Sequence, residues 1–181
     1  MPKNGPLFPE TAVGNLICPT GPSRRGLSMG KILDEIRKFF KDDQWPFTEM
    51  EGKTILRTGF SGKNGKWTCF AQARENQQQF IFYSVCPNAA PEDKRPAAME
   101  FITRANYGLV IGNFEMDVTD GEIRCKTSID VEGGDLNHVL IRQVVYSNVM
   151  TMNKYLPGLM SVLYANVSPE QAIHTIEGKA G

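Results

Sequence analysis

Four cysteines and two histidines are the residues of this chain best suited to metal binding or nucleophilic chemistry. Structural zinc and redox sites usually need cysteines in close pairs, separated by about two residues. The four cysteines are far apart in the sequence: Cys18, Cys69, Cys86 and Cys125. The histidines, His138 and His174, complete no metal-binding motif. We therefore predict no metal site and no cofactor.

Motifs that would indicate catalysis are also missing. The chain has no G-x-S-x-G nucleophile elbow, no phosphate-binding P-loop and no G-x-G-x-x-G dinucleotide motif. We predict no catalytic residues and a non-enzymatic protein; an enzyme ranks third among the functional hypotheses.

Acidic and basic residues alternate between 115 and 126, which could indicate acid–base chemistry or a matched pair of strands. Asp120-Gly121 is a strong hairpin signal, and it favours a type I′ turn. Pairing outward from that turn sets acids opposite bases, which is stabilising in antiparallel strands. The predicted pairs are Phe114–Thr127, Glu115–Lys126, Met116–Cys125, Asp117–Arg124 and Val118–Ile123. The acids are thus predicted to be structural.

The composition excludes several classes of protein. Twenty basic and twenty acidic residues give a formal net charge of zero without a basic cluster, which argues against nucleic-acid binding. No apolar run approaches the length of about 18 residues that spans a bilayer, so we expect no membrane insertion. Cys69 and Cys125 fall on the apolar phase of expected strands, so buried thiols are predicted. With no visible signal peptide, this predicts a cytoplasmic protein.

The chain divides into a tail and one folded region. Residues 1–28 are rich in Pro, Gly and Ser and are predicted to be a flexible tail, whereas residues 29–178 form the domain. An amphipathic helix is predicted from Met29 to Lys41, with Ser28 as its cap. A hairpin centred on Asn64-Gly65 follows. Its expected pairs are Leu56–Ala73, Thr58–Ala71 and Phe60–Cys69.

The later elements complete an α+β pattern. Residues 80–86 are apolar on both phases and indicate a central strand. A second helix is expected to end at Asn106 in a left-handed conformation, followed by a strand with a bulge at Gly112-Asn113. Further expectations are an N-cap at Asp135, a helix break at Pro157-Gly158 and a capping box from Ser168 to Gln171. The predicted fold is an antiparallel sheet packed with helices in the order α-β-β-β-β-α-β-β-α-α.

Two groups of residues are candidates for function. Asn106, Tyr107 and Asn113 are candidate ligand-binding residues at the junction of a helix and a bulged strand, although capping that helix and setting the turn explains them too. The last long helix carries an apolar arc wider than one sheet requires, so part of it is a candidate dimer or partner interface. The interface candidates are Leu136, Ile141, Val145, Val149 and Met152.

Five short motifs resemble one bacterial family. They are Arg104-Ala-Asn-Tyr-Gly-Leu, Gly112-Asn-Phe-Glu, Asp120-Gly-Glu-Ile-Arg, Tyr155-x-Pro-Gly and Pro169-Glu-x-Ala-Ile. With the order of elements, they are similar to the YbjN family, in its cyanobacterial-type branch, over residues 29–178. The resemblance implies a fold like that of type III secretion chaperones and a role in sensory-transduction regulation. The family has no agreed biochemical activity, so the resemblance implies no catalytic residue.

Two hypotheses follow. The first is a non-enzymatic, chaperone-like or adaptor protein, dimeric, that binds an extended segment of another protein at a free sheet edge or beside residues 136–152. The alternative is a small-molecule sensor without catalysis, with its pocket near Asn106, Tyr107 and Asn113.

Overall fold

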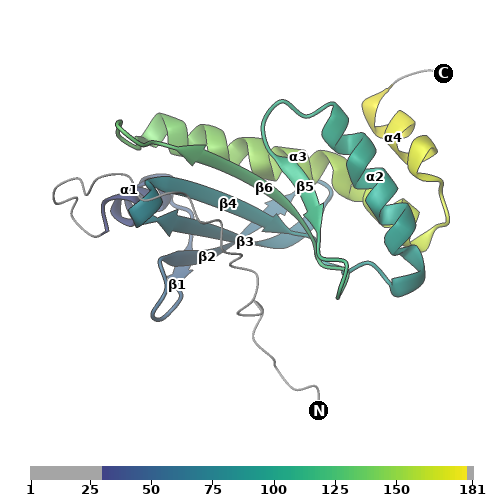
Figure 1. Cartoon of the computed structure of the whole chain (residues 1–181), viewed down its shortest axis with the longest axis horizontal. Coiled ribbons are helices and arrows are strands. Elements are labelled where there is room, and N and C mark those ends of the chain that lie inside the picture. Colours follow the sequence, from purple (N-terminus) through teal and green to yellow (C-terminus); the bar gives the residue numbers. More distant parts are fainter. Residues whose placement is uncertain (1–29, 179–181) are drawn as a thin grey trace, which may run out of the picture.

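The computed structural model describes residues 30–178 (Figure 1). Two short 3-10 helices, η2 (Glu75–Gln77) and η3 (Glu92–Lys94), join the main elements. Those elements are α1 (Lys31–Asp42), β1 (Phe47–Glu49), β2 (Ile55–Gly62), β3 (Gly65–Arg74), β4 (Gln79–Val85), α2 (Arg95–Tyr107), β5 (Asn113–Met116), β6 (Ile123–Asp130), α3 (His138–Tyr164) and α4 (Pro169–Glu177). The predicted order of helices and strands, and with it the α+β class, is confirmed. The predicted tail and the Ser28 cap lie outside the described residues.

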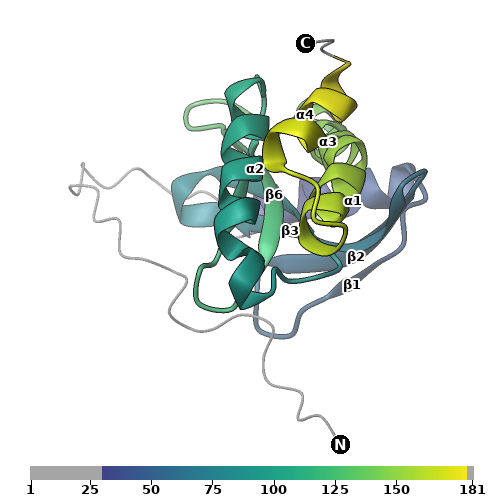
Figure 2. The ribbon, with the colours of Figure 1, turned by 90° about the vertical axis from the view of Figure 1, so that its right-hand side faces the viewer.

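All strand pairs of the sheet are antiparallel, in the order β1-β2-β3-β4-β6-β5. β4 is central, as its apolar sequence predicted. Helix α1 and the long helix α3 both pack on the face that carries Phe82. Helices α2 and α4 pack on each other and on α3 at the β5 end of the sheet (Figure 2). The opposite face carries mixed side chains such as Arg57, Phe70 and Tyr83.

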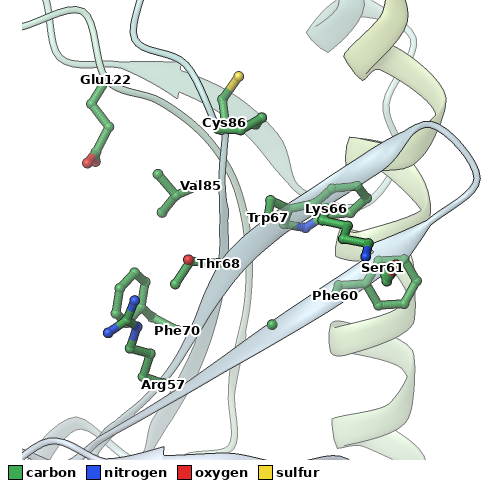
Figure 3. Close-up of a pocket in the computed structure, with 12 residues that line it drawn as sticks. Arg57, Phe60, Ser61, Lys66, Trp67, Thr68, Phe70, Val85, Cys86 and Glu122 are labelled. Atoms are coloured by element: carbon green, nitrogen blue, oxygen red, sulfur yellow. The ribbon is translucent and has the colours of Figure 1, made fainter.

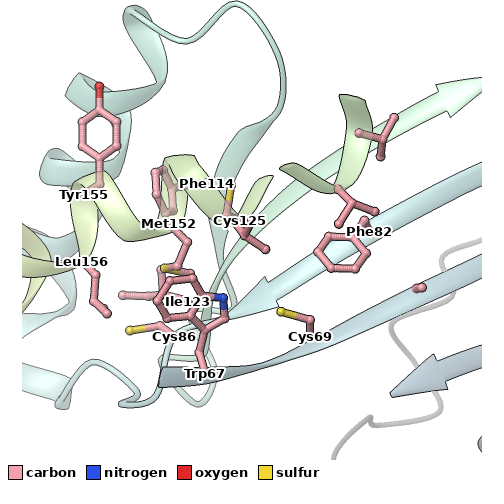
Figure 4. Close-up of a cluster of buried hydrophobic side chains, with 14 of the residues drawn as sticks. Trp67, Cys69, Phe82, Cys86, Phe114, Ile123, Cys125, Met152, Tyr155 and Leu156 are labelled. Carbon is pink, nitrogen blue, oxygen red and sulfur yellow. The ribbon is translucent and has the colours of Figure 1, made fainter. Parts of the chain in front are cut away.

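Large side chains and thiols fill the core between the sheet and α3 (Figure 4). The indole N–H of Trp67 donates to the Ser84 hydroxyl at 2.9 Å, so this buried polar group is satisfied. Cys69 and Cys125 are fully buried, as predicted, and burial raises the pKa of each thiol to about 12. Burial also raises the pKa of Cys86 to about 11. These three thiols therefore stay protonated and unreactive at neutral pH. Cys18 lies outside the described residues.

The first hairpin turns one residue earlier than predicted. Gly62 pairs with Gly65, so the turn is Lys63-Asn64 and every predicted partner on β3 is displaced by two residues. Leu56 pairs with Ala71 rather than Ala73. Neither turn residue has positive φ, so the turn is not type I′. A displacement of two keeps each side chain on its predicted face, because side chains alternate with a period of two.

The predicted helix break at Pro157-Gly158 is wrong, because α3 runs without interruption through both residues. Proline has no N–H and leaves the carbonyl four residues earlier, that of Asn153, without its helical donor. The side-chain amide of Asn64 donates to this carbonyl at 2.8 Å instead, and the Asn64 backbone N–H donates to Asn153 Oδ1 at 3.0 Å. The hairpin tip therefore supplies the hydrogen bond that Pro157 cannot make.

The second hairpin also differs from the prediction by two residues. Met116 pairs with Ile123, and the Asp117 N–H donates to the Glu122 carbonyl at 2.9 Å, closing a four-residue loop instead of a type I′ turn. The Asp117 carboxylate accepts from the Thr119 N–H at 2.8 Å rather than pairing with Arg124. This local bond within the loop competes with the predicted cross-strand pair.

The predicted bulge at Gly112-Asn113 is also wrong. Leu109–Gly112 is irregular, and β5 begins only at Asn113. Gly112 has a φ of +80°, and a Cβ there would lie 2.6 Å from the Lys126 carbonyl oxygen. The close approach of this turn to β6 requires glycine, and it ends the strand pairing.

Helix boundaries were predicted least well. α2 continues through Asn106 to Tyr107 without a left-handed residue at Asn106, because the Asn106 side chain bonds to β5 instead. α3 begins after Asn137, whose side chain accepts from the Leu140 N–H at 3.0 Å; the predicted cap, Asp135, forms an ion pair with Lys31. The Ser168 cap of α4 is confirmed.

The start of α1 is held by a residue distant in sequence. The two carboxylate oxygens of Glu75 accept from the backbone N–H groups of Ile32 and Leu33 at 3.1 and 2.8 Å. A carboxylate at a helix N-terminus satisfies unpaired donors and complements the helix dipole. This contact fixes α1 against the turn between β3 and β4.

Candidate functional site

The three candidate ligand-binding residues lie near each other at the start of β5, but two of them are engaged with backbone. The Asn106 amide accepts from the Phe114 N–H at 2.7 Å and donates to the Phe114 carbonyl at 2.9 Å. The Asn113 amide also donates to that carbonyl, at 3.2 Å. Tyr107 is 96% exposed. Asn106 thus fastens α2 to β5, Asn113 bonds within β5, and only Tyr107 presents its whole side chain to a ligand or partner.

The five interface candidates lie in the core of the chain itself. Each is at most 5% exposed: Leu136, Ile141, Val145, Val149 and Met152. The apolar side chains that α3 leaves accessible are different ones. Tyr164, the last residue of the helix, is 56% exposed, and earlier in the helix lie Val139 at 61%, Met150 at 57% and Tyr146 at 38%. Their positions at i, i+7 and i+11 place them on one face of the helix. A partner that docks on α3 would meet this second set.

β6 extends beyond its neighbour and leaves part of the sheet edge without a strand. Pairing with β5 covers Ile123–Lys126, whereas Ser128–Asp130 continue past the last pair, Asn113–Lys126. The Asp117–Glu122 bond shows that even-numbered residues of β6 direct their backbone groups toward β5. Ser128 and Asp130 therefore present N–H and C=O groups outward. In residues 30–178, no strand pairs with them on this side.

Two exposed apolar side chains precede Gly112, the residue at which the chain reaches this edge. At Gly112 the chain touches Lys126 and Thr127, and the preceding residues then leave the edge of the sheet. Val110 is 97% exposed and Ile111 is 51% exposed. Large apolar side chains that are almost fully exposed and adjacent in sequence are typical of interaction surfaces when they cluster. We name Tyr107, Val110, Ile111 and the backbone of Ser128–Asp130 the β6 edge site.

Charged residues on β5 and β6 border the site. Glu115 accepts from Arg124 Nε and Lys126 Nζ, both at 2.5 Å, so one carboxylate bridges two cations. Burial alone would raise the pKa of Glu115, but the bonds from Lys126 and Arg124 outweigh it and lower that pKa. The hydrogen bond from Gln79 and that from the Glu132 N–H lower the pKa of Asp130. These acids are therefore ionised and matched at neutral pH.

Catalytic and metal-binding arrangements are not found in the described part of the chain. Residues 30–178 contain no group of three His, Cys, Asp or Glu side chains that could hold a metal ion. The His138 ring packs against Phe39 at a tilt of 54°, with ring centroids 4.9 Å apart, and its Nε2 lies 3.3 Å from Asp43 Oδ1, which joins α3 to the end of α1. Within the same residues, no helix is both long and apolar enough to cross a membrane.

Sequence reasoning did not locate the β6 edge site. It predicted a strand that runs through a bulge at Gly112-Asn113, and such a strand would have continued along this edge. The length difference between four-residue β5 and eight-residue β6 creates the open edge. The run of apolar residues before Gly112 was a usable signal, because the chain turns away from the sheet at this glycine.

The fold that carries this site is an antiparallel six-stranded sheet with α1 and α3 on one face and an open edge at β6. Residues 33–161 match the YbjN family, described as "Putative bacterial sensory transduction regulator", and the chain belongs to this family. The predicted family is therefore confirmed, while its cyanobacterial-type branch stays a prediction. No curated protein sequence matches the chain.

Two solved structures are similar in fold. The crystal structure of YbjN from E. coli has a TM-score of 0.51 and 15% identity, with 74% of this chain and 90% of that chain covered. A chain of the HopA1–SchA chaperone–effector complex has a TM-score of 0.46 and 10% identity, with coverage of 73% and 99%. A chaperone complex is thus among the similar structures, as the resemblance implied.

Proposed function

We propose that this protein is a non-enzymatic regulator of the adaptor or chaperone type, which acts by binding an extended segment of another protein. The observation that carries the proposal is the β6 edge site, where the outward backbone groups of Ser128–Asp130 continue past the contact of Gly112 with Lys126 and Thr127, and where the exposed Val110 and Ile111 precede that glycine. An extended segment that adds to an open edge gains main-chain hydrogen bonds, and side-chain pockets or patches then select its sequence. A strand edge that stays accessible without a binding partner favours aggregation between chains.

The family supports a regulatory rather than a catalytic role, because its description is that of a sensory-transduction regulator. The three free, buried thiols of the core support a location in a reducing compartment, which we propose to be the cytoplasm. A small-molecule sensor at Asn106, Tyr107 and Asn113 is less well supported, since the two asparagine side chains are bonded to Phe114.

Proline at position 128 is the sharpest test of the edge. Ser128→Pro removes an N–H that points away from the sheet, so β6 keeps its bonds to β4 and the fold should persist. Ser128→Ala keeps the N–H and is the matched control. We expect affinity purification from the source cells to recover one or a few stoichiometric proteins with wild type and Ser128→Ala, and none of them with Ser128→Pro.

Two results would contradict the proposal. Recovery of no protein by the wild type would remove the adaptor function, and equal recovery by all three forms would place binding elsewhere than on β6. Circular dichroism and thermal melting of Ser128→Pro confirm that any loss of binding is not loss of fold.

A homodimer is proposed through the accessible face of α3, because Val139, Tyr146 and Met150 form its exposed apolar stripe. Val139→Lys with Met150→Lys should give a monomer by sedimentation without unfolding the chain. Charged substitutions at the buried Val145 and Val149 would instead unfold the core and cannot test assembly. A wild-type chain that sediments as a monomer would contradict the dimer.

A further inference from the structure

The face of the sheet opposite α1 and α3 carries an apolar patch. Phe82 of β4 lies on the helix side, where its ring is near that of Phe40 of α1. Since successive side chains of a strand point to opposite faces, Ile81, Tyr83 and Val85 point away from the helices. Phe70 of β3 joins them because it pairs directly with Tyr83. We name Phe70, Ile81, Tyr83 and Val85 the open-face patch.

The patch is largely buried, although no helix of residues 30–178 packs on it. Phe70 is 4% exposed and Ile81 is 9% exposed, values in the range of the core that faces the helices. Arg57, the β2 partner of Phe70 on the same face, is exposed, so burial is not general to this face. A strand that is apolar on both phases, as β4 is, is typical of a sheet covered on both sides. Burial and sequence pattern together indicate a cover over the patch.

The patch continues into a cleft where β3 and β4 part. Their pairing ends at Thr68–Val85, and the Cys86 N–H then bonds to the Ile123 carbonyl at 2.8 Å. The cleft has a volume of about 660 Å³, and Figure 3 shows Phe70 at one end of it, followed by Thr68 and Val85. The surface to be covered is thus a hollow rather than a flat sheet, and an extended segment laid along it can place large apolar side chains there.

The N-terminal segment, residues 1–29, is the part of the chain suited to cover the patch. A second copy or another protein would bury Phe70 and Ile81 only on binding, whereas they are buried in the single chain. The segment joins α1, whose first N–H groups are bonded to Glu75, next to the last β3–β4 pair, Arg74–Gln79. Phe70 lies about 13 Å from Arg74 along β3. The chain from residue 18 to residue 30 can span up to about 40 Å, so the segment reaches the patch.

We propose that residues 7–18 of this segment dock on the open-face patch of the same chain. The stretch has one charged side chain, Glu10, and carries the apolar Leu7, Phe8, Val13, Leu16 and Ile17. Docking removes apolar surface of the stretch and of the patch from water, which is favourable. For residues 7–18 this replaces the prediction of a flexible tail. The proposal goes beyond protein binding at the β6 edge site, because it concerns the face of the sheet.

A nitroxide on Cys18 tests the contact in the full-length chain. The three thiols of the core are buried and protonated, with pKa values of about 11 and about 12, so a maleimide nitroxide is directed to Cys18. We expect the amide NMR signals of Phe70 and Ile81 to lose at least half of their intensity relative to the reduced label, while those of α4 keep theirs. Broadening confined to the start of α1, where the segment joins the domain, would overturn the proposal.

Paired variants test which side chains hold the segment. Phe8→Ser with Leu16→Ser should restore the broadened signals of β3 and β4 at least twofold. Leu27→Ser with Met29→Ser, outside residues 7–18, removes two apolar side chains as well and should restore nothing. Phe70→Thr, which keeps a residue suited to a strand, should release the segment from the other side of the contact. Broadening that persists in the first pair, or that is lost equally in both pairs, would overturn the proposal.

Mixing separates a contact within one chain from a contact between copies. Nitroxide-labelled protein is added to isotopically labelled Cys18→Ser protein, which carries no nitroxide. We expect no broadening of the Phe70 signal in this mixture; broadening there would assign the cover to a second copy and overturn docking within the chain. Ser128→Pro should leave the broadening within the nitroxide-labelled chain unchanged, which separates this test from that of the adaptor function.

Discussion

Two hairpins of the sheet, β2–β3 and β5–β6, carry similar turn sequences but are positioned by different contacts. The β2–β3 tip is held by α3, through the bonds of Asn64 to Asn153. The β5–β6 loop is held mainly by its own side chains, since Asp117 and Asp120 accept from the N–H groups of Thr119 and Glu122. Two further hydrogen bonds reach it from outside: the Ala90 N–H donates to the Gly121 carbonyl at 2.8 Å, and Arg95 Nη1 donates to the Val118 carbonyl at 3.1 Å.

This difference shows two ways to set a strand register. In the first hairpin a distant helix offers an unsatisfied carbonyl, and the turn that reaches it determines the pairing. In the second, aspartate side chains bond to nearby backbone and lengthen the loop. Both registers differ from a two-residue Asn-Gly or Asp-Gly turn by two residues. An even displacement preserves the buried face, and this is why the core was predicted correctly while the partners were not.

The largest expected effect is at the second hairpin. Gly121 has a φ of +81°, and a Cβ there would lie 2.2 Å from the Ala90 carbonyl oxygen. Gly121→Ala should lower the free energy of unfolding by about 3 kcal/mol, from left-handed strain plus backbone displacement. Gly52→Ala is the control, because Gly52 has a φ of +69° with no atom near its Cβ position. If Gly121→Ala and Gly52→Ala lower the free energy of unfolding in urea equally, the contact with Ala90 contributes nothing to the loss at Gly121.

An intermediate effect is expected at the first hairpin. Asn64→Ala removes the donor to the Asn153 carbonyl and should cost about 1 kcal/mol of unfolding free energy. In a Pro157→Ala background the helix regains an N–H for that carbonyl, so the same substitution should cost less. A double-mutant cycle on thermal or urea unfolding measures the coupling. If the losses of the two substitutions simply add, Asn64 does not replace the N–H donor that Pro157 lacks.

The smallest expected effect concerns the charges between β5 and β6. The folded pKa of Glu115 is below its ordinary value of 4.5, so its ion pairs stabilise the fold above that pH and are lost as pH falls through the folded pKa. Glu115→Gln should cost about 0.5 kcal/mol at pH 7, and the difference from wild type should shrink as the pH falls below 4.5. A difference independent of pH would assign the loss to packing instead of charge.

The fold was predictable because its signals are periodic and repeated. Alternating burial in β2, β3 and β6 and the apolar stripe of α1 identify elements without knowledge of their partners. The four misplaced boundaries, at Asn106, Gly112, Asp135 and Pro157, share one physical feature. At each, a contact distant in sequence or a local turn replaces the hydrogen bond on which the prediction relied. Asp135 pairs with Lys31, and Asn106 bonds to Phe114.

The candidate sites were less predictable than the fold. Asn106 and Asn113 were correctly placed together at the α2–β5 junction, but their hydrogen bonds to Phe114 depend on where β5 begins. The apolar arc of α3 was correctly recognised as wide, yet the structure buries Ile141, Val145 and Val149 in the core of the chain. Such a helix is covered by α1, α2, α4 and the sheet together. The number of elements that cover a helix cannot be predicted from the apolar pattern of that helix alone.

The sequence by itself determined the class of fold, the order of its elements, the buried face of each strand and the family. These depend on side-chain periodicity, which is local and survives an error of two residues in register. Only the tertiary structure decided the registers, the continuity of α3 through Pro157, the open edge of β6 and the cleft where β3 and β4 part. Each of these depends on whether a particular backbone N–H or C=O finds its partner, and that partner is usually distant in the chain.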